Sequence, residues 1–251
     1  MNSISANLNI MIKAVEKASK KIIRDFGEVE KLQVSLKGPS DFVSTADTKA
    51  EKTIIEELIK SKKNYSIISE ECGFIPNKDK NNTWIIDPID GTTNFLHGVP
   101  HFAISIALRS NDEIVIGLIY DPIKDEMFYA EKNNGSYFNN KKIKVSKRKN
   151  LENSLIALGK IDNNLVKKIS EKKISTRRSG SAALDMAYVA AGRYDGYFQK
   201  NLKLWDVAAG IVIIREAGGK VNNIDLNKND NIKIIASNDS INDNLTKILS
   251  D

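Results

Sequence analysis

The sequence has few thiol and imidazole groups: its 251 residues include one cysteine, Cys72, and two histidines, His97 and His101. A single cysteine excludes a disulfide within the chain and is typical of a reducing compartment. A zinc site needs several such ligands, so we expect none, and we expect Cys72 to be a packed side chain rather than a nucleophile. No apolar run approaches the roughly 20 residues that cross a bilayer. We therefore predict a cytoplasmic protein without a membrane segment.

Aromatic residues make up only 7% of the chain, and 32 acidic residues do not balance 38 lysines and arginines, which leaves a net charge of +6. Much of the excess lies in residues 141–149, Lys-Lys-Ile-Lys-Val-Ser-Lys-Arg-Lys. This run could contact nucleic acid or an acidic protein, but it lacks the aromatic residues on which single-stranded bases stack. It alternates like an exposed edge strand, where lysines discourage edge-to-edge pairing. We expect a solvated face and keep binding through residues 141–149 as the lesser alternative.

Apolar periodicity predicts a long helix over residues 4–26 that ends at Gly27, a C′ glycine. Residues 37–48 are polar and predict a loop. Thr48 and Glu51 have the spacing of a capping box and predict the start of the next helix. At 41% hydrophobic and 28% charged, the chain has the composition of an ordinary globular protein with a sizeable core.

The rest of the chain changes its pattern near residue 150. Before it, runs rich in Ile, Val, Phe and Tyr predict strands at 66–69, 84–87, 102–109, 113–121 and 126–131, the last three in an antiparallel meander. After it, strands at 154–158, 194–198 and 232–236 alternate with helices at 162–172, 181–192, 205–217 and 241–249. We predict one unit, residues 1–251, made of an N-terminal α+β lobe (1–148) fused to a C-terminal α/β lobe (149–251).

The stretch Trp84-Ile-Ile-Asp-Pro-Ile-Asp-Gly-Thr-Thr-Asn-Phe95 predicts a buried strand followed by a turn with unusual chemistry. Pro88 has no N–H and disfavours helix at Asp87, so we expect the strand to stop there. Gly91 permits a positive φ, and the polar residues after it favour the start of a helix. Two carboxylates beside free backbone donors can hold a hard cation and a phosphate side by side.

Six acidic residues stand where predicted elements end or begin: Asp47, Glu70, Glu71, Asp87, Asp90 and Asp206. Asp206 begins an almost wholly apolar helix, and position alone leaves open whether it caps that helix or faces a site. Carboxylates gathered without lysine or arginine repel one another unless a cation neutralises them. Oxygen-only ligands select a hard cation, and Mg²⁺ bridging to phosphate is the usual solution.

Five segments in this order resemble the inositol monophosphatase family of magnesium-dependent, lithium-sensitive phosphatases. They are residues 84–97, residues 205–219, the Ser-Asp-Phe-Val-Ser-Thr-Ala-Asp segment at 40–47, Ser-Glu-Glu at 69–71 and Arg-Ser-Gly-Ser-Ala-Ala at 178–183. The resemblance covers essentially the whole chain. It implies an α+β fold, a layered α/β/α/β/α sandwich, and usually a homodimer.

The resemblance also implies roles for single residues. Two or three Mg²⁺ ions would be held by Glu70, Asp87, the carbonyl of Ile89, Asp90 and Asp206. Thr92 and Asp47, with Glu70 and a metal, would orient and activate the attacking water. Lys37 would lie on a mobile loop that carries part of a further metal site. The residues implied to contact substrate are Asp90, Gly91, Thr92, Gly180, Ser181, Ala182, Gln199 and Asp206.

Gln199 departs from the family, which has an acidic residue at this position to contact inositol hydroxyls. Glutamine can still hydrogen-bond a hydroxyl but lacks the charge. We expect hydrolysis of myo-inositol monophosphate, with histidinol phosphate, a nucleotide 3′-phosphate or a sugar bisphosphate as alternative substrates. A third hypothesis is a nucleic-acid-binding or protein-binding factor that uses residues 141–149.

Overall fold

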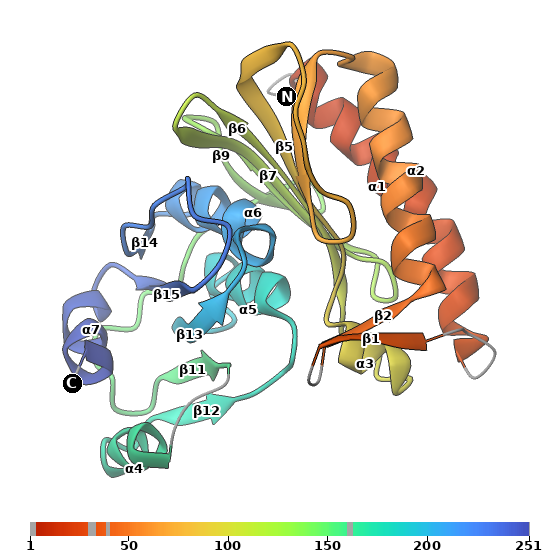
Figure 1. Cartoon of the computed structure of the whole chain (residues 1–251). Helices are drawn as coiled ribbons and strands as arrows, with labels where there is room; N and C mark the ends of the chain where they lie inside the picture. The colour runs from red at the N-terminus through yellow and green to blue at the C-terminus, as the bar shows by residue number, and fades with distance from the viewer. Residues whose placement is uncertain (1–3, 30–33, 39–40, 160–162, 251) are drawn as a thin grey trace.

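The computed structural model describes residues 4–29, 34–38, 41–159 and 163–250, and side chains within 4–29, 45–159 and 165–249. The elements form five layers, helix, sheet, helix, sheet and helix (Figure 1). This is the α+β sandwich that the resemblance implied.

The larger sheet has eight strands in the order β10-β9-β8-β7-β6-β5-β3-β4. They are β3 (Tyr65–Ser69), β4 (Gly73–Ile75), β5 (Asp79–Asp90), β6 (Ala103–Ser110), β7 (Glu113–Asp121), β8 (Glu126–Glu131), β9 (Gly135–Phe138) and β10 (Lys141–Ile143). Neighbours from β5 to β10 pair antiparallel, which confirms the predicted meander. β3 instead pairs parallel with β5, so the C-terminal ends of these two strands meet at one edge.

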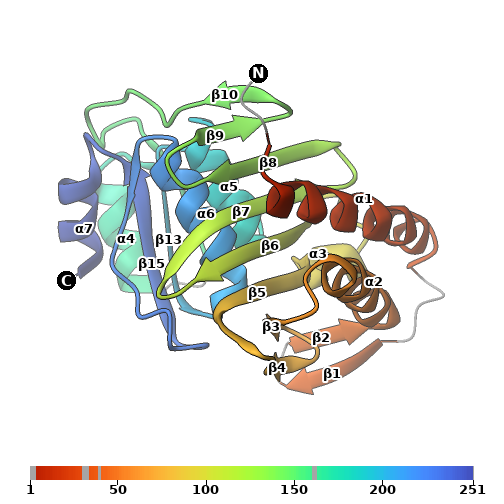
Figure 2. The same cartoon turned by 90° about the horizontal axis from the view of Figure 1, so that it is seen from above.

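Two long helices, α1 (Ala6–Phe26) and α2 (Thr45–Ser61), cover one face of this sheet (Figure 2). Their apolar stripes pack with the sheet residues around Trp84 into one buried cluster. Ser5 caps α1 by accepting a hydrogen bond from the N–H of Leu8 at 3.2 Å. The short strands β1 (Val34–Gly38) and β2 (Asp41–Ser44) form a separate antiparallel pair that leads into α2.

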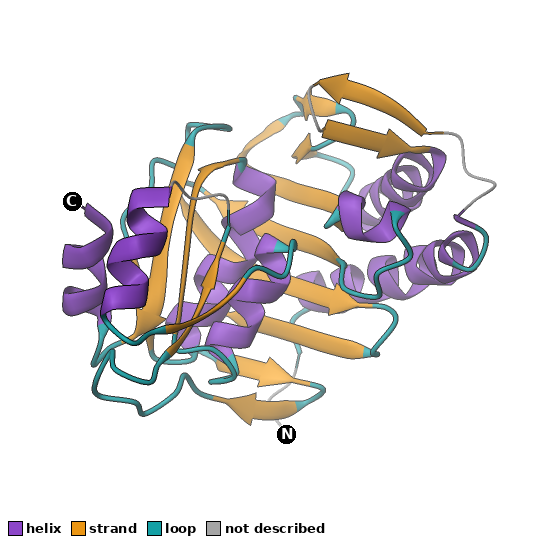
Figure 3. Ribbon diagram, turned by 90° about the horizontal axis from the view of Figure 1, so that it is seen from below, coloured by secondary structure: helices purple, strands orange, loops and turns teal. Residues whose placement is uncertain are grey.

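The second sheet has five strands in the order β12-β11-β13-β15-β14. They are β11 (Leu155–Leu158), β12 (Ser175–Arg177), β13 (Gly196–Leu202), β14 (Gly219–Val221) and β15 (Ile232–Asn238). The helices α5 (Ala182–Ala190) and α6 (Leu204–Glu216) lie between the two sheets, and α4 (Asn163–Glu171) and α7 (Asn242–Ser250) cover the outer face (Figure 3). The almost wholly apolar sequence of α6 follows from this position, because both of its sides are buried.

Three local predictions were wrong. Gly27 ends α1 but is right-handed, with φ −68°, because the chain continues as a further turn rather than reversing through a left-handed residue. The polar segment 37–48 is not a loop throughout: β1 and β2 occupy part of it, and α2 already begins at Thr45. Thr48 and Glu51 therefore lie inside the helix and form no capping box.

Strand β5 also runs further than its sequence suggests. It begins at Asp79, in a segment expected to be loop, and continues through Pro88 to Asp90. The register against β6 shifts by one residue, from Asp87 opposite Ser105 to Asp90 opposite Ala103. This bulge places Pro88 where a ladder hydrogen bond is not required. Among the described residues, no helix is both long and apolar enough to cross a membrane.

Candidate active site

The bulge at the end of β5 turns Asp87 and Asp90 toward the same side. Asp87 is buried and accepts a hydrogen bond from the N–H of Ile89 at 3.0 Å. Gly91 follows with φ +100°, and its Cα lies so close to the carbonyl groups of His101 and Gly180 that a Cβ would come within 3.2–3.3 Å of both oxygens. The position requires glycine for both reasons. The short helix α3 (Thr92–Leu96) begins at once, as the sequence predicted.

Asp206 lies in the first turn of α6. The sequence left open whether it caps this helix or faces a site, and the structure shows that it does both. Its Oδ2 accepts a hydrogen bond from the N–H of Lys203 at 2.8 Å, so it helps to cap the helix. Carboxylate oxygens of Asp206, Asp87 and Asp90 also lie within 4.8 Å of one another. The same side chain therefore both caps α6 and completes a cluster of three carboxylates.

Burial and like charge raise the pKa values of this cluster. Burial raises the pKa of Asp87 well above its ordinary value, and the charge of Glu70 beside it raises it further. Burial likewise raises the pKa of Asp206 well above its ordinary value, assisted by the charge of Asp90. Burial raises the pKa of Asp90 to about 6, although hydrogen bonds from the start of α5 oppose the shift. These shifts mark a group of carboxylates that a cation would stabilise strongly.

The donor set fits Mg²⁺. The three clustered ligand atoms are all carboxylate oxygens, and Glu70, at the end of β3, faces Asp87 closely enough to share a hydrogen bond. The described side chains supply no histidine or cysteine to the cluster. Hard oxygen ligands of this kind suit Mg²⁺.

Thr92 and Asp47 meet beside the carboxylates. The hydroxyl of Thr92 lies 3.4 Å from Oδ1 of Asp47 and 3.1 Å from the carbonyl oxygen of Ile89. Asp47 is fully buried in the first turn of α2. The first N–H groups of α3 have no acceptor within their own helix, because a helix leaves its first turn unpaired.

The segment before α5 completes the site from the other sheet. The hydroxyl of Ser181 and the N–H of Ala183 both donate to Oδ2 of Asp90, the latter at 2.7 Å. Asn94, in α3, donates through Nδ2 to the carbonyl oxygens of His101 at 2.7 Å and Ser179 at 2.8 Å. Gly180, with φ +87°, therefore lies directly against the turn that follows β5. The predicted residues 180–182 are thus held at the carboxylate cluster.

Gln199 occupies β13 and is half-buried. Its side chain covers Gly159, where a Cβ would overlap it at 1.9 Å. Its Oε1 accepts a hydrogen bond at 2.8 Å from the hydroxyl of Tyr197, which is fully buried. The charges of Asp185, Asp90 and Asp206 contribute, after burial, to raising the pKa of Tyr197, so this pair lies within electrostatic reach of the cluster.

Other predicted residues lie apart from the cluster or outside the described part of the chain. Glu71 lies beyond Glu70, and its N–H donates to Glu51. The backbone of Lys37 is in β1, but its side chain is not described. His97, which follows α3, bonds to the carbonyl of Thr93. Cys72 is exposed and free, so the prediction of a packed side chain was wrong. Neither histidine belongs to the group of potential metal ligands.

The sequence reasoning missed four residues that support the site: Glu51, Asn94, Asp185 and Tyr197. Asp185 is buried in α5, accepts a hydrogen bond from the hydroxyl of Ser179, and has a pKa raised by burial to about 7. Asn94 follows the Gly-Thr-Thr turn directly, so its place in that stretch was a usable signal. For the others, no local pattern indicated a role.

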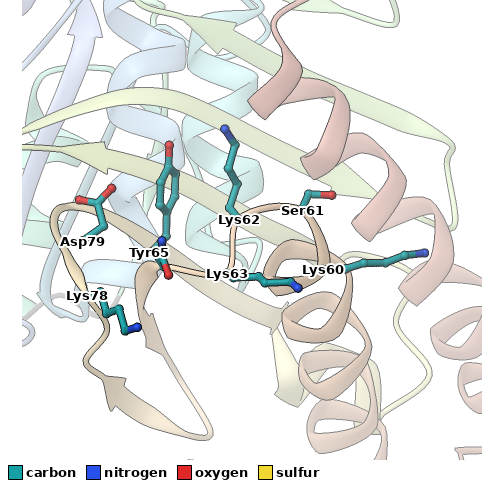
Figure 4. Close-up of a pocket in the computed structure, with 8 residues that line it drawn as sticks. Lys60, Ser61, Lys62, Lys63, Tyr65, Lys78 and Asp79 are labelled. Atoms are coloured by element: carbon teal, nitrogen blue, oxygen red, sulfur yellow. The ribbon is translucent and has the colours of Figure 1, made fainter.

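A separate hollow of about 520 Å³ lies at the C-terminal end of α2, away from the carboxylates (Figure 4). It is lined by Lys60, Ser61, Lys62, Lys63, Asn64, Tyr65, Lys78 and Asp79. The amino groups of Lys62, Lys63 and Lys78 point in different directions in Figure 4 and do not converge on one position. This hollow therefore lacks the converging polar groups of the cluster around Asp87.

A model of the inositol monophosphatase family matches residues 5–251 of the chain. The chain belongs to the inositol monophosphatase family. It is 48% identical to the inositol-1-monophosphatase of Rhizobium meliloti (strain 1021) over 224 residues, covering 86% of this chain and 84% of that one. It is 41% identical over 227 residues to the Nus factor SuhB of Pasteurella multocida (strain Pm70), covering 85% and 84%.

Among solved structures, the extragenic suppressor protein SuhB of Bartonella henselae superposes with a TM-score of 0.93 at 46% identity, covering 98% of each chain. Membership of the family makes this protein a phosphatase, a phosphoric monoester hydrolase that acts on small phosphorylated substrates. The family is generally metal-dependent, in agreement with the cluster of Asp87, Asp90 and Asp206.

Proposed function

We propose that this protein hydrolyses myo-inositol monophosphate to inositol and phosphate with a metal-activated water. The observation that carries the proposal is the meeting of Asp87, Asp90 and Asp206 within 4.8 Å, beside the turn at Gly91. The names of its similar relatives favour inositol monophosphate over other esters.

In this proposal the metal ligands are Glu70, Asp87, the carbonyl oxygen of Ile89, Asp90 and Asp206, holding two or three Mg²⁺ ions. Bound Mg²⁺ lowers the pKa of water and stabilises the charge that develops on the ester oxygens. The backbone N–H groups of Gly91 and Thr92 bind the phosphate oxygens. Because these groups are preorganised, they stabilise the phosphoryl charge without reorganising during the reaction.

The protein's own residues position the attacking water. Thr92 donates its proton toward Asp47, so the lone pairs of its hydroxyl oxygen accept a hydrogen bond from the water. Glu70 takes the proton that the water loses. A P–O bond forms to the water oxygen while the ester P–O bond breaks in line, and the inositol oxygen leaves with a proton from solvent. Direct attack by water produces no phosphoenzyme.

A panel of phosphate esters with Mg²⁺ tests the proposal. We expect inositol 1-phosphate to have the highest kcat/KM among inositol 1-phosphate, histidinol phosphate, a nucleotide 3′-phosphate and fructose 1,6-bisphosphate. Much faster hydrolysis of another ester would refute inositol as the substrate and leave the chemistry in place. Gln199, together with Gly180, Ser181 and Ala182, is our candidate set for contacts with the alcohol.

A second candidate function is binding of nucleic acid or protein through residues 141–149. Two observations favour keeping it: relatives bear the name Nus factor SuhB, and a hollow of about 530 Å³ lies along this run. β10, at the edge of the sheet, covers only Lys141–Ile143, so the predicted edge strand accounts for the first third of the run. Replacing Lys141, Lys144 and Lys147 should abolish such binding and spare hydrolysis. Absence of affinity for RNA or DNA at moderate salt would exclude nucleic acid.

Three further expectations remain proposals. We infer a homodimer and inhibition by Li⁺ from the family, and a cytoplasmic location from the single cysteine. Light scattering, assays with LiCl and fractionation of cells test them in turn. The division into lobes at residues 148 and 149 is also a proposal, and limited proteolysis tests it.

A further inference from the structure

Glu51 is a buried carboxylate that the proposed reaction does not use. It lies in the second turn of α2 and is fully buried. No lysine or arginine among the described residues pairs with it. Burying a carboxylate without a cation lowers the free energy of unfolding, and an apolar side chain would pack α2 on the sheet without this loss. The presence of Glu51 in the core is therefore best explained by the hydrogen bonds that it makes.

Two of the hydrogen bonds that Glu51 makes flank one residue, and the thiol of Cys72 makes a further one. Oε1 of Glu51 accepts hydrogen bonds from the hydroxyl of Ser69 and from the N–H of Glu71, the latter at 2.9 Å. Glu70 stands between them, at the point where β3 ends and the chain turns. The N–H of Glu70 donates to the carbonyl of Ile86 at 3.2 Å, which fixes it to β5. One carboxylate oxygen thus holds the side chain of Ser69 and the backbone of Glu71, the residues on either side of Glu70.

The position of Glu51 on α2 gives this contact a second consequence. Asp47 precedes it by four residues, so both side chains leave the same face of the helix. Asp47 meets Thr92, on one side of the water site, while Glu51 holds the turn at Glu70 on the other. One rigid helix therefore sets the distance between the two groups that are proposed to activate the water.

We propose that Glu51 is a positioning residue: its Oε1 orients Glu70 toward Asp87 and aligns it with the pair of Thr92 and Asp47. The inference rests on the proposed role of Glu70 as a metal ligand and base. It assigns to Glu51 the function of an acceptor of two hydrogen bonds, so the geometry of that oxygen matters rather than the charge of the group. Partners that orient a metal ligand typically change metal affinity by about 10- to 100-fold when removed.

The test measures Mg²⁺ binding by calorimetry without substrate, with kcat and KM for the ester as a second readout. We expect Glu51→Leu to weaken Mg²⁺ binding by about 10- to 100-fold. We expect Ser69→Ala to weaken it in the same direction, and Glu51→Gln, which keeps Oε1, to stay close to the wild type. In Glu51→Leu the loss should fall on kcat rather than on KM, since the candidate contacts to the alcohol lie at residues 180–182.

A control separates positioning from general stability. Ile54→Val, a buried change on the same helix, should lower the melting temperature and leave Mg²⁺ affinity unchanged. Wild-type Mg²⁺ affinity in folded Glu51→Leu would overturn the inference, as would a loss in Glu51→Gln equal to that in Glu51→Leu. If Glu51→Leu does not fold, Ser69→Ala decides: unchanged Mg²⁺ affinity and kcat overturn the inference. If the wild-type protein binds Mg²⁺ but does not hydrolyse inositol phosphate, the proposed substrate is refuted and the inference about Glu51 is not.

Discussion

Ser181, at the N-cap of α5, donates its hydroxyl hydrogen bond to Asp90, which lies 91 residues earlier in the chain. The N–H of Ala183 donates to the same oxygen. Hydrogen bonds from the start of a helix in the second half of the chain thus favour the ionised form of a carboxylate in the first sheet, against the effect of its burial. The carboxylate cluster and the segment proposed to bind the alcohol are therefore one connected structure.

Removing the Ser181 hydroxyl should move the pH dependence of Mg²⁺ binding. Its hydrogen bond lowers the pKa of Asp90, which burial raises to about 6. In Ser181→Ala this pKa rises further, and because Mg²⁺ binds the carboxylate, the midpoint of affinity against pH moves to higher pH. Calorimetry between pH 5 and pH 8 measures it. Ser181→Thr keeps the hydroxyl and serves as the control. Identical midpoints for wild type and Ser181→Ala would contradict the prediction.

Ser181→Ala also removes a helix cap, because Ser181 accepts a hydrogen bond from the N–H of Leu184 at 3.3 Å. Loss of an N-cap costs about 1 kcal/mol. The lost cap should therefore lower the free energy of unfolding by about that amount at every pH. Above about pH 6, loss of the hydrogen bond to ionised Asp90 adds to this decrease.

Asp87→Asn should stabilise the metal-free protein while abolishing Mg²⁺ binding. Asp87 is buried beside other carboxylates, and its pKa is raised well above the ordinary value, so its ionised form destabilises the fold without a cation. We expect the melting temperature without metal to rise by about 2–4 °C for each kcal/mol recovered. Saturating Mg²⁺ raises the melting temperature of the wild type only. A Mg²⁺-dependent shift in the variant would count against Asp87 as a ligand.

Asp185 should make the free energy of unfolding depend on pH between its ordinary pKa and its pKa in the folded protein. Burial raises this pKa from an ordinary 3.8 to about 7. The folded state therefore binds the proton more tightly than the unfolded state. The stability that this gives is fully present below about pH 4 and is lost as the pH rises through about 7.

Asp185→Asn should remove this dependence. The asparagine still accepts the hydrogen bond from Ser179 and carries no charge, so it should stabilise the protein at pH 8 by on the order of 2 kcal/mol. Urea unfolding at pH 5 and pH 8 measures the difference. Asp112→Asn, an exposed change in the turn between β6 and β7, should alter neither value. A gain in Asp185→Asn that is equal at both pH values would show that its cause is not the charge.

The sequence predicted that the carboxylates of Asp87, Asp90 and Asp206 meet because they stand beside strong local signals. Asp87 and Asp90 flank a proline in a buried strand, and Asp206 opens an apolar helix. These signals fix where the elements end, and sheet pairing of β3 with β5 then brings Glu70 to the same edge. The turn after β5 and the antiparallel meander were predictable for the same reason.

The supporting residues could not be predicted, because their partners are distant in the chain. Glu51 looked like half of a capping box with Thr48, yet its oxygen bonds to Ser69 and Glu71 across the α2–β3 interface. Asp185 lies in the first turn of a helix of small apolar residues, where the helix dipole favours an acidic residue, so nothing local indicated its contact with Ser179. Tertiary packing decided both, and packing leaves no trace in local periodicity.

The hydrogen bond between Tyr197 and Gln199 leads to a prediction about which alcohol, the leaving group of the ester, the proposed substrate site favours. The buried phenol donates to Oε1 of Gln199 at 2.8 Å and uses one of the two lone pairs of this uncharged oxygen, while the NH₂ group of Gln199 can only donate. A carboxylate at this position would instead accept a hydrogen bond from a sugar hydroxyl as well as from Tyr197. Gln199→Glu should therefore raise kcat/KM for inositol 1-phosphate.

The expected gain is about 10- to 100-fold, since a hydrogen bond to a charged group contributes about 1.5–3 kcal/mol. Tyr197→Phe frees Oε1 of Gln199 and should act in the same direction, more weakly, because the freed acceptor is uncharged. The control is p-nitrophenyl phosphate, which has no sugar hydroxyl and should be hydrolysed at an unchanged rate, with unchanged Mg²⁺ affinity. An equal gain on both esters would show that Gln199 acts on the metal site. No gain on either would show that it does not contact the alcohol.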